Sequence, residues 1–275
     1  MNVAILGCGP TGLIAAHACA LRDVGYTIFS KRRKSFLFGS QYLHEPIPGI
    51  VEEPEGVWVK YINVGSPEEY RRKTHGKFWD GIAAPEDFET EHRAWNIREA
   101  YDRLWQKYGR YVENYEFKSA HETECELELR NYDLVISTVP RTIWKIPGEE
   151  YVYSTGWAIG DAPEHGLFVP YDVEDNRIIC DGSDLALYNR LSKVFGYTTV
   201  EWPAMASEEE INASLPPELE VSKLLKPLRY QPNPHTPNPT DDWLHVGRYG
   251  AWQKGVVVTD AWHSVMSKID ELKGN

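Results

Sequence analysis

Three glycines near the N-terminus have the spacing of loops that hold a dinucleotide. Residues 7–12, Gly-Cys-Gly-Pro-Thr-Gly, have the form G-x-G-x-x-G. They follow an apolar run at 3–6 and precede an Ala- and Leu-rich segment, which is the strand-to-helix context that the motif requires. In such a loop the first glycine makes the turn, the second admits a pyrophosphate, and the third lets helix and strand pack closely. The motif predicts five cofactor-binding residues: Gly7, Gly9, Pro10, Thr11 and Gly12.

A basic run stands where a carboxylate is usual. In dinucleotide-binding folds an acidic side chain about 20 residues after the glycines binds a ribose hydroxyl. Here that position falls on Ser30 or Lys31, and the next residues are Arg32, Arg33 and Lys34. We expect the run to contact a 2′-phosphate of an NADP-type cofactor, a cofactor pyrophosphate or an anionic substrate. A solvated basic loop is the alternative interpretation.

A Gly-Arg pair near the C-terminus is a second candidate for binding phosphate. Gly247 and Arg248 follow a short apolar strand-like segment. A guanidinium can bridge two phosphate oxygens with paired hydrogen bonds. A helix beginning near Val257 would direct its N-terminal dipole at the same region. The alternative is that Arg248 is an ordinary surface arginine.

The elements that must position these residues can be predicted from hydrophobic periodicity and turn residues. The pattern predicts strands at 3–6, 26–30, 132–140 and 243–246, and helices at 11–21, 94–108 and 257–272. Short strand signals between residues 151 and 202, broken by Gly, Pro and Asp, predict an antiparallel sheet. Residues 227–239 contain five prolines and are expected to form an extended connector.

Composition limits the class of protein. The 275 residues include 41 acidic and 29 basic side chains, a net charge of -12, which argues against a broad nucleic-acid-binding surface. The sequence has no apolar run long enough for a transmembrane helix and no signal-peptide pattern, so we expect a cytoplasmic protein without membrane contact. The four cysteines are scattered and H-E-x-x-H and G-x-S-x-G are absent, so we expect no metal site and no hydrolase triad.

Several segments together resemble the superfamily of flavin amine oxidases and UDP-galactopyranose mutases. The glycine-rich start is similar to its FAD-binding loop, and residues 133–140 are similar to its strand that returns to the FAD domain. Residues 38–42 lie where the family places a second glycine motif, with Ser40 at its second glycine, and residues 246–252 resemble its C-terminal Gly-Arg motif. Two segments, 188–192 and 198–203, are similar to mutase strands.

The resemblance implies a non-covalently bound FAD and further site residues. Those expected near the flavin are Gly39, Ser40, Gln41, Tyr42, Gly247, Arg248 and Trp252. Those expected near the substrate are Tyr188, Arg190 and Trp202. His44 follows the second glycine motif and is our candidate to position a substrate or move a proton. For the aromatic residues, packing in the core is an equal alternative.

The expected architecture is α/β, with a Rossmann-like FAD-binding domain interleaved with a smaller substrate domain of antiparallel sheet and helix. The FAD-binding domain would comprise residues 1–56, 111–140 and 241–275, and the substrate domain residues 57–110 and 141–240. Neither the electron acceptor nor the oligomeric state can be inferred from the sequence.

Four functions are consistent with these residues. The first is FAD-dependent oxidation of a C–N bond in an amine or amino-acid-like substrate, which is small or linked to a nucleotide. The second is a mutase-like isomerase acting on a sugar nucleotide, in which Arg190 binds the phosphates. The third places the amine on an amino-acyl-modified thymine of phage DNA, with residues 31–34 or residues 71–73 facing the DNA backbone. The fourth is an NADP-binding protein without flavin.

Overall fold

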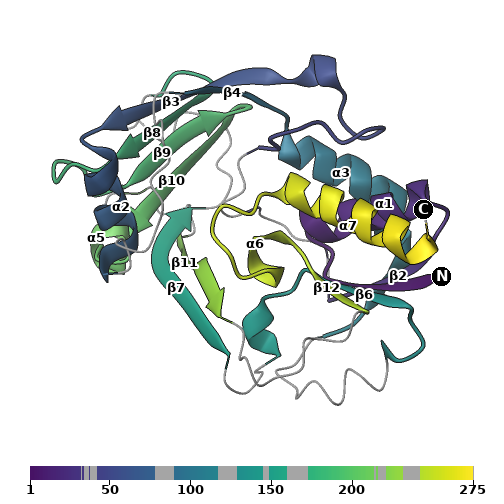
Figure 1. Cartoon of the computed structure of the whole chain (residues 1–275). Coiled ribbons are helices and arrows are strands. Elements are labelled where there is room, and N and C mark those ends of the chain that lie inside the picture. Colours follow the sequence, from purple (N-terminus) through teal and green to yellow (C-terminus); the bar gives the residue numbers. More distant parts are fainter. Residues whose placement is uncertain are drawn as a thin grey trace.

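The structure is a computed structural model, and it describes most of the chain. The described residues are 1–31, 33, 37, 42–77, 90–116, 129–144, 149–159, 173–213, 215, 221–231 and 242–274. The predictions for Arg32, Gly39, Ser40 and Gln41 therefore lie outside the described residues. Figure 1 shows two sheets, with the helices α1, α3 and α7 grouped beside one of them.

The first sheet is entirely parallel and has the strand order β12-β6-β1-β2-β5. Its strands are β1 (Asn2–Leu6), β2 (Gly25–Ser30), β5 (Val112–Asn114), β6 (Leu134–Ser137) and β12 (Trp243–His245). They come from the three segments 1–56, 111–140 and 241–275. Val3 to Leu6 are fully buried, because both faces of this sheet are covered by apolar clusters.

Three helices cover one face of the parallel sheet: α1 (Pro10–Leu21), α3 (Ile97–Tyr108) and α7 (Val258–Lys273). α1 lies between α3 and α7 and is buried along most of its length. α3 begins three residues later than predicted, because the Asn96 side chain accepts hydrogen bonds from the N–H groups of Arg98 and Glu99 and caps the helix there. It lies within 57–110 of the sequence but packs against α1 in the parallel-sheet core.

The second sheet has the order β11-β7-β10-β9-β8-β3-β4. Its strands are β3 (Val57–Val64), β4 (Glu91–Ala94), β7 (Glu150–Ile159), β8 (Arg177–Asp181), β9 (Arg190–Val194), β10 (Tyr197–Pro203) and β11 (Val221–Gln231). The pairs β7–β10, β10–β9 and β9–β8 are antiparallel, as predicted, whereas β3 and β8 are parallel, so the sheet is mixed.

The prediction of a connector beginning at Pro227 is wrong at its start. Pro227 lies within β11, where the register against β7 shifts between Pro227 and Arg229. A proline cannot donate to the sheet ladder and is tolerated at such an irregularity. The rest of the predicted connector, from residue 232, lies outside the described residues.

The two faces of the second sheet differ in chemistry. One face carries an apolar cluster with the short helix α5 (Glu208–Ala213), centred on Val200, Trp202 and Ile211. The other face carries charged and hydroxyl side chains next to α2 (Pro67–His75) and α6 (Gly247–Gly250). Sequence analysis did not predict α2, which begins at Pro67 after a capping box formed by Ser66 and Glu69. No helix of the described residues is long and apolar enough to cross a membrane.

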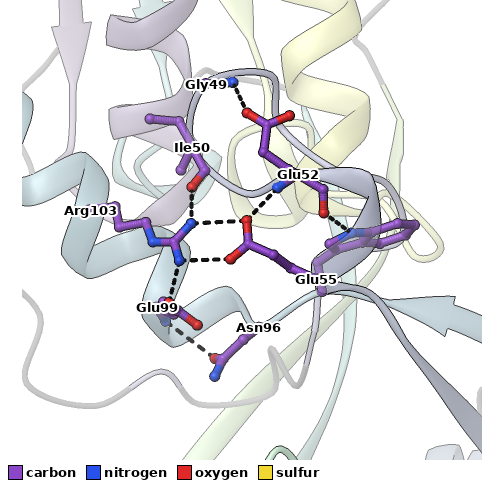
Figure 2. A network of polar contacts seen from close by, with 8 residues as sticks. Gly49, Ile50, Glu52, Glu55, Asn96, Glu99 and Arg103 are labelled. Carbon is purple, nitrogen blue, oxygen red and sulfur yellow. Dashed lines mark hydrogen bonds and ion pairs between the residues drawn. The ribbon is translucent and has the colours of Figure 1, made fainter.

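Polar contacts fasten the segment before β3 to α3 (Figure 2). The Arg103 guanidinium donates to the Ile50 carbonyl at 2.5 Å and to Glu55 at 2.7 and 3.1 Å, and it also pairs with Glu99. Glu55 in turn accepts from the Glu52 backbone N–H at 2.6 Å, within the 3-10 turn Glu53–Glu55. These contacts hold the chain that leads from Tyr42 to the second sheet.

Candidate functional site

Gly7 and Gly12 bring the glycine loop against the ends of the parallel strands. Gly7 has φ +103°, and a Cβ there would lie 2.5 Å from Thr138 Oγ1, just beyond β6. A Cβ on Gly12 would lie 1.9 Å from the Gly7 carbonyl oxygen, so only glycine lets α1 start this close to β1. The predicted roles of Gly7 as the turn and Gly12 as the contact of helix and strand agree with this geometry.

The C-terminal Gly-Arg motif packs directly on the glycine loop. A Cβ on Gly247 would lie 2.8 Å from Thr11 Cγ2, and one on Gly250 would lie 2.5 Å from the Ser137 carbonyl oxygen. Residues 7–12, 137–138 and 247–250 therefore meet at the carboxyl ends of β1, β6 and β12. We call this place the nucleotide edge. In open α/β sheets this is the end at which ligands bind.

The start of α1 fits a phosphate group. Gly9 is its N-cap, without a side-chain capping bond, and the first turn carries no acidic residue. A Cβ on Gly9 would meet nothing within 4 Å, so the space over the loop is open to a ligand. Backbone N–H groups and the helix dipole at such an end favour an anion. The residues at the nucleotide edge thus fit a dinucleotide pyrophosphate.

The described members of the basic run have carboxylate partners. Lys31 Nζ lies 2.7 Å from Glu116 Oε1, and Arg33 pairs with Asp102. Both pairs are largely exposed. Ser30 lies at the end of β2, and its carbonyl accepts from the Tyr115 N–H at 3.0 Å. The structure therefore places Ser30 and Lys31 beside β5 and its following residues.

A buried ionic cluster lies on the polar face of the second sheet. Glu201 on β10 accepts from Lys226 Nζ at 2.7 Å and pairs with Arg190 through its other oxygen. The side chains of Glu201 and Lys226 are each 8% exposed. Burial raises the pKa of Glu201, but Arg190 and Lys226 outweigh it and lower that pKa to about 2. Glu201 is thus an anion held between two cations.

Gly156 allows this cluster to form across β7. β7 lies between β11, which carries Lys226, and β10, which carries Glu201. A Cβ on Gly156 would lie 3.3 Å from Lys226 Cε and 2.8 Å from the Trp202 carbonyl oxygen. Because glycine has no side chain, the lysine stem passes over β7 and reaches the carboxylate.

The same face joins the two parts of the chain. Tyr42, expected beside the flavin, is buried, and its hydroxyl lies 2.8 Å from the hydroxyl of Tyr61 on β3. Burial raises the pKa of Tyr61, whereas the charge of Arg190 lowers it, so the Arg190 guanidinium faces this pair. The structure thus brings one expected cofactor residue, Tyr42, near one expected substrate residue, Arg190.

The three expected substrate residues do not lie together. Successive residues of a strand point to opposite faces. Arg190 pairs with Glu201 across β9 and β10, so Trp202, the next residue, points to the apolar face. There Trp202 is fully buried, and Tyr188 packs against the same cluster. Only Arg190 of the three faces α2 and α6.

His44 and Trp252 have contrasting surroundings. His44 is exposed, with its ring centroid 4.7 Å from that of Tyr42. Trp252 is fully buried, has φ +53° and contacts Tyr151 and Tyr153 edge to face. Its buried indole Nε1 has no hydrogen-bond partner in the described part of the chain. A left-handed backbone at a bulky residue is costly and is typical of sites under functional constraint.

Sequence reasoning did not predict Lys226, Lys254, Tyr61 or His75 as members of this face. A signal exists for Lys226, which stands in the otherwise apolar run of residues 224–228. Such a lysine within a buried strand needs a carboxylate partner. Lys254 and His75 lie in segments without any such pattern, so only the fold brings them to the sheet.

Comparisons with known proteins support the fold. No protein-family model and no curated protein matches the chain. Among solved structures it is similar to reduced UDP-galactopyranose mutase, with TM-score 0.58 and 13% identity over 99% of this chain and 94% of that chain. It is also similar to a geranylgeranyl bacteriochlorophyll reductase-like protein from Thermoplasma acidophilum, with TM-score 0.55 and 13% identity over 99% and 79% of the chains.

A flavoprotein/dehydrogenase from Cytophaga hutchinsonii gives TM-score 0.54 and 12% identity over 100% of this chain and 79% of that chain. At 12–13% identity these likenesses concern the fold. The chain therefore has a Rossmann-like α/β fold with a parallel sheet and a second, mixed sheet, and its fold is similar to that of these structures.

Proposed function

We propose that the chain is an FAD-dependent oxidoreductase that acts on the C–N bond of a small amine or amino-acid-like substrate. The observation that carries the proposal is the nucleotide edge, where the uncapped start of α1, the open space over Gly9 and the Gly247–Thr11 contact converge. The fold similarity to a flavoprotein/dehydrogenase and to reduced UDP-galactopyranose mutase supports a flavin as the dinucleotide. The resemblance of residues 38–42 and 246–252 to motifs of the superfamily of flavin amine oxidases and UDP-galactopyranose mutases supports a flavin, and the amine substrate rests on the amine oxidase branch of that resemblance.

The residues of this chain would bind and orient the reactants. The first turn of α1 would hold the pyrophosphate, and Arg248 would face the cofactor from α6. The substrate would lie next to the hydroxyls of Tyr42 and Tyr61 and the guanidinium of Arg190. A bound flavin supplies the two-electron chemistry, in which a hydride leaves the carbon of the C–N bond and the resulting imine is hydrolysed.

A mutase-like isomerase is the second candidate. The placement of Arg190 beside the Tyr42–Tyr61 pair favours it, because a sugar nucleotide needs a cation for its phosphates next to the reacting centre. The two candidates differ in one requirement. The mutase reaction depends on prior reduction of the flavin, whereas amine oxidation consumes the oxidised form.

The visible absorption spectrum of the purified protein tests the shared part of the proposal. We expect a flavin spectrum, and FAD in the supernatant after denaturation. If the protein is colourless and does not bind added FAD, both candidates are excluded, and titration with NADPH would test NADP binding instead. With FAD present, bleaching by amines without added reductant would support the oxidoreductase. Turnover of a sugar nucleotide only after dithionite reduction would support the mutase.

A further inference from the structure

The first half of β7 has a strand neighbour on one side only. β7 pairs with β11 over residues 150–159, but it pairs with β10 only over residues 156–158. The pairing with β10 stops where Pro203, the last residue of β10, lies opposite Gly156. Residues 150–155 therefore have no strand partner on the side of β10 in the described part of the chain, and Figure 1 shows β7 running on beside β11 there. We call residues 150–155 the free edge.

Alternate residues of the free edge direct their backbone groups outward. In an antiparallel pair, every second residue of a strand directs its N–H and C=O groups to the same neighbour. A Cβ on Gly156 would lie 2.8 Å from the Trp202 carbonyl oxygen, so Trp202 and the residue opposite it, Trp157, bond across β10 and β7. Two steps further back along β7, Tyr153 lies opposite Pro227, which has no N–H to offer it. The residues whose N–H and C=O groups face away from β11 are therefore Tyr151, Tyr153 and Thr155.

A cavity runs along the free edge. It has a volume of about 610 Å³, and all six residues of the free edge line it. The other lining residues are Lys73 and residues 75–77 at the end of α2, and Ala204 and Met205 just after β10. The free edge is about 20 Å long, at about 3.3 Å per residue, so the wall that it forms suits an elongated ligand.

The charges of the cavity lining nearly cancel. Lys73 Nζ lies 3.5 Å from Asp181 Oδ1, so its charge is balanced within the protein. The His75 imidazole is buried, and burial is the main cause that lowers its pKa to about 3, so this histidine is neutral. Lys77 and Glu150 add one charge of each sign. A ligand without net charge complements this lining.

Two large apolar side chains of the cavity lining are exposed. Met205 is 82% exposed and Tyr153 is 42% exposed. Side chains alternate along a strand, so Tyr153 shares its face of β7 with Tyr151 and Thr155. A strand added at the free edge would place every second side chain over this face, where an apolar residue would cover Tyr153.

We propose that the free edge binds an extended segment of another polypeptide, with uncharged, apolar side chains at alternate positions, as an additional strand of the second sheet. The added strand exchanges hydrogen bonds with the outward-facing N–H and C=O groups of β7 and covers Tyr153 and Met205. A second copy of this chain is a poorer occupant, because its own free edge is recessed beside α2 in the same way and two recessed edges do not meet. A stable dimer also needs about 1,000 Å² or more of buried surface, which one short edge does not supply.

The probe is a capped hexapeptide of alternating threonine and valine. It is titrated into the purified full chain, with whatever cofactor that carries, and binding is read by calorimetry. Two isomers of the probe carry N-methyl groups, one on the three threonines and the other on the three valines. Only every second N–H of an added strand faces β7, so one isomer should lose binding while the other keeps it.

Thr155→Pro tests the same hydrogen bonds from the side of the protein. The N–H of Thr155 faces away from β11, so a proline there costs no bond within the sheet. The affinity for the hexapeptide should fall about fivefold or more, the scale of one backbone hydrogen bond. Thr155→Val is the matched control, because it keeps the N–H and the size of the side chain, and it should bind the hexapeptide as the wild type does. Melting temperatures of both variants show whether the fold is kept.

Three results would overturn the proposal. The first is no saturable binding of the hexapeptide to the wild type. The second is equal binding of the two N-methylated isomers, which would show a ligand that fills the cavity without extending the sheet. The third is dimerisation of the chain, seen by light scattering, that the hexapeptide reverses, which would make a second copy the occupant. None of these readouts requires catalysis or a flavin, so they are distinct from a failure of the proposed oxidoreductase activity.

Discussion

The nucleotide edge and the buried ionic cluster of Glu201, Arg190 and Lys226 lie in different sheets and are built in opposite ways. The nucleotide edge is built from backbone. Gly7, Gly12 and Gly247 have no side chains, so the strand ends and helix starts there can approach one another closely. The ionic cluster uses long charged side chains that meet from β9, β10 and β11. The first construction fixes a position with little charge, whereas the second concentrates charge and depends on a partner for its stability.

Glu201→Gln should have the largest effect on stability, because it removes the negative charge of the buried ionic cluster. It leaves Lys226 and Arg190 without their buried counter-charge, and we expect a loss of about 3–5 kcal/mol in unfolding free energy. Urea unfolding measures it through the midpoint at unchanged slope. A loss below about 1 kcal/mol would show that water solvates the charges of Lys226 and Arg190 when Glu201 no longer balances them.

Gly12→Ala and Gly9→Ala test the backbone side as a pair. The Gly12 variant forces a Cβ against the Gly7 carbonyl and should cost at least the ~1–3 kcal/mol of an overpacked site. The Gly9 variant meets open space, so its melting temperature should stay that of the wild type while FAD affinity falls. Thermal unfolding and flavin-fluorescence titration separate the two effects. Unchanged FAD affinity in Gly9→Ala would contradict a pyrophosphate over this loop.

The pH dependence of stability should distinguish Lys254 from ordinary lysines. The pKa of Lys254 is about 8 in the folded chain, below the ordinary 10.5 of an unfolded lysine. Between these values the unfolded chain binds more protons, so stability should rise with pH across this range. Chemical denaturation at several pH values between 8 and 10.5 measures it. The rise should be absent in Lys254→Gln and present in the control Lys223→Gln, because Lys223 is an exposed lysine on β11.

Glu55→Gln should have the smallest effect. Glu55 is bound to Arg103 in the exposed network of Figure 2, where solvent and salt screen the pair. The denaturation midpoint should shift less than in any variant above. The shift should vanish near about 1 M salt, where the Debye length is about 3 Å. A shift as large as that of Glu201→Gln would mean that the contrast between buried and exposed networks does not hold.

The contrast also explains what could be predicted from the sequence. The glycine loop, its flanking strand and helix, and the Gly-Arg pair are local patterns, so the sequence predicts them directly. The apolar stripe of α3 predicts the helix, but its first residue depends on the Asn96 cap, which periodicity does not reveal. The parallel pairing of β3 with β8 joins distant segments and leaves no local signal.

The site residues follow the same rule. Arg190 is recognisable in its strand motif, but its distance from Trp202 depends on which face of β10 each residue takes. The surroundings of Lys254 and His75 depend on charged residues from other segments of the chain, so no local pattern predicts them. The cofactor roles of Arg32, Gly39, Ser40 and Gln41 stay predictions, since these residues lie outside the described part of the chain.

The contact between Thr11 and Gly247 also bears on how the protein is assembled. Thr11 and Gly247 are far apart in the sequence, so their contact closes a long loop, which costs conformational entropy. We therefore expect the contact to form only after the chain between them has folded. During synthesis β1, α1 and β2 are made before β5, β6 and β12, so the parallel sheet is complete only once β12 has been made. A dinucleotide that needs both the glycine loop and Arg248 can bind only after residue 250 has left the ribosome. Cofactor loading would then report that the last strand is in place.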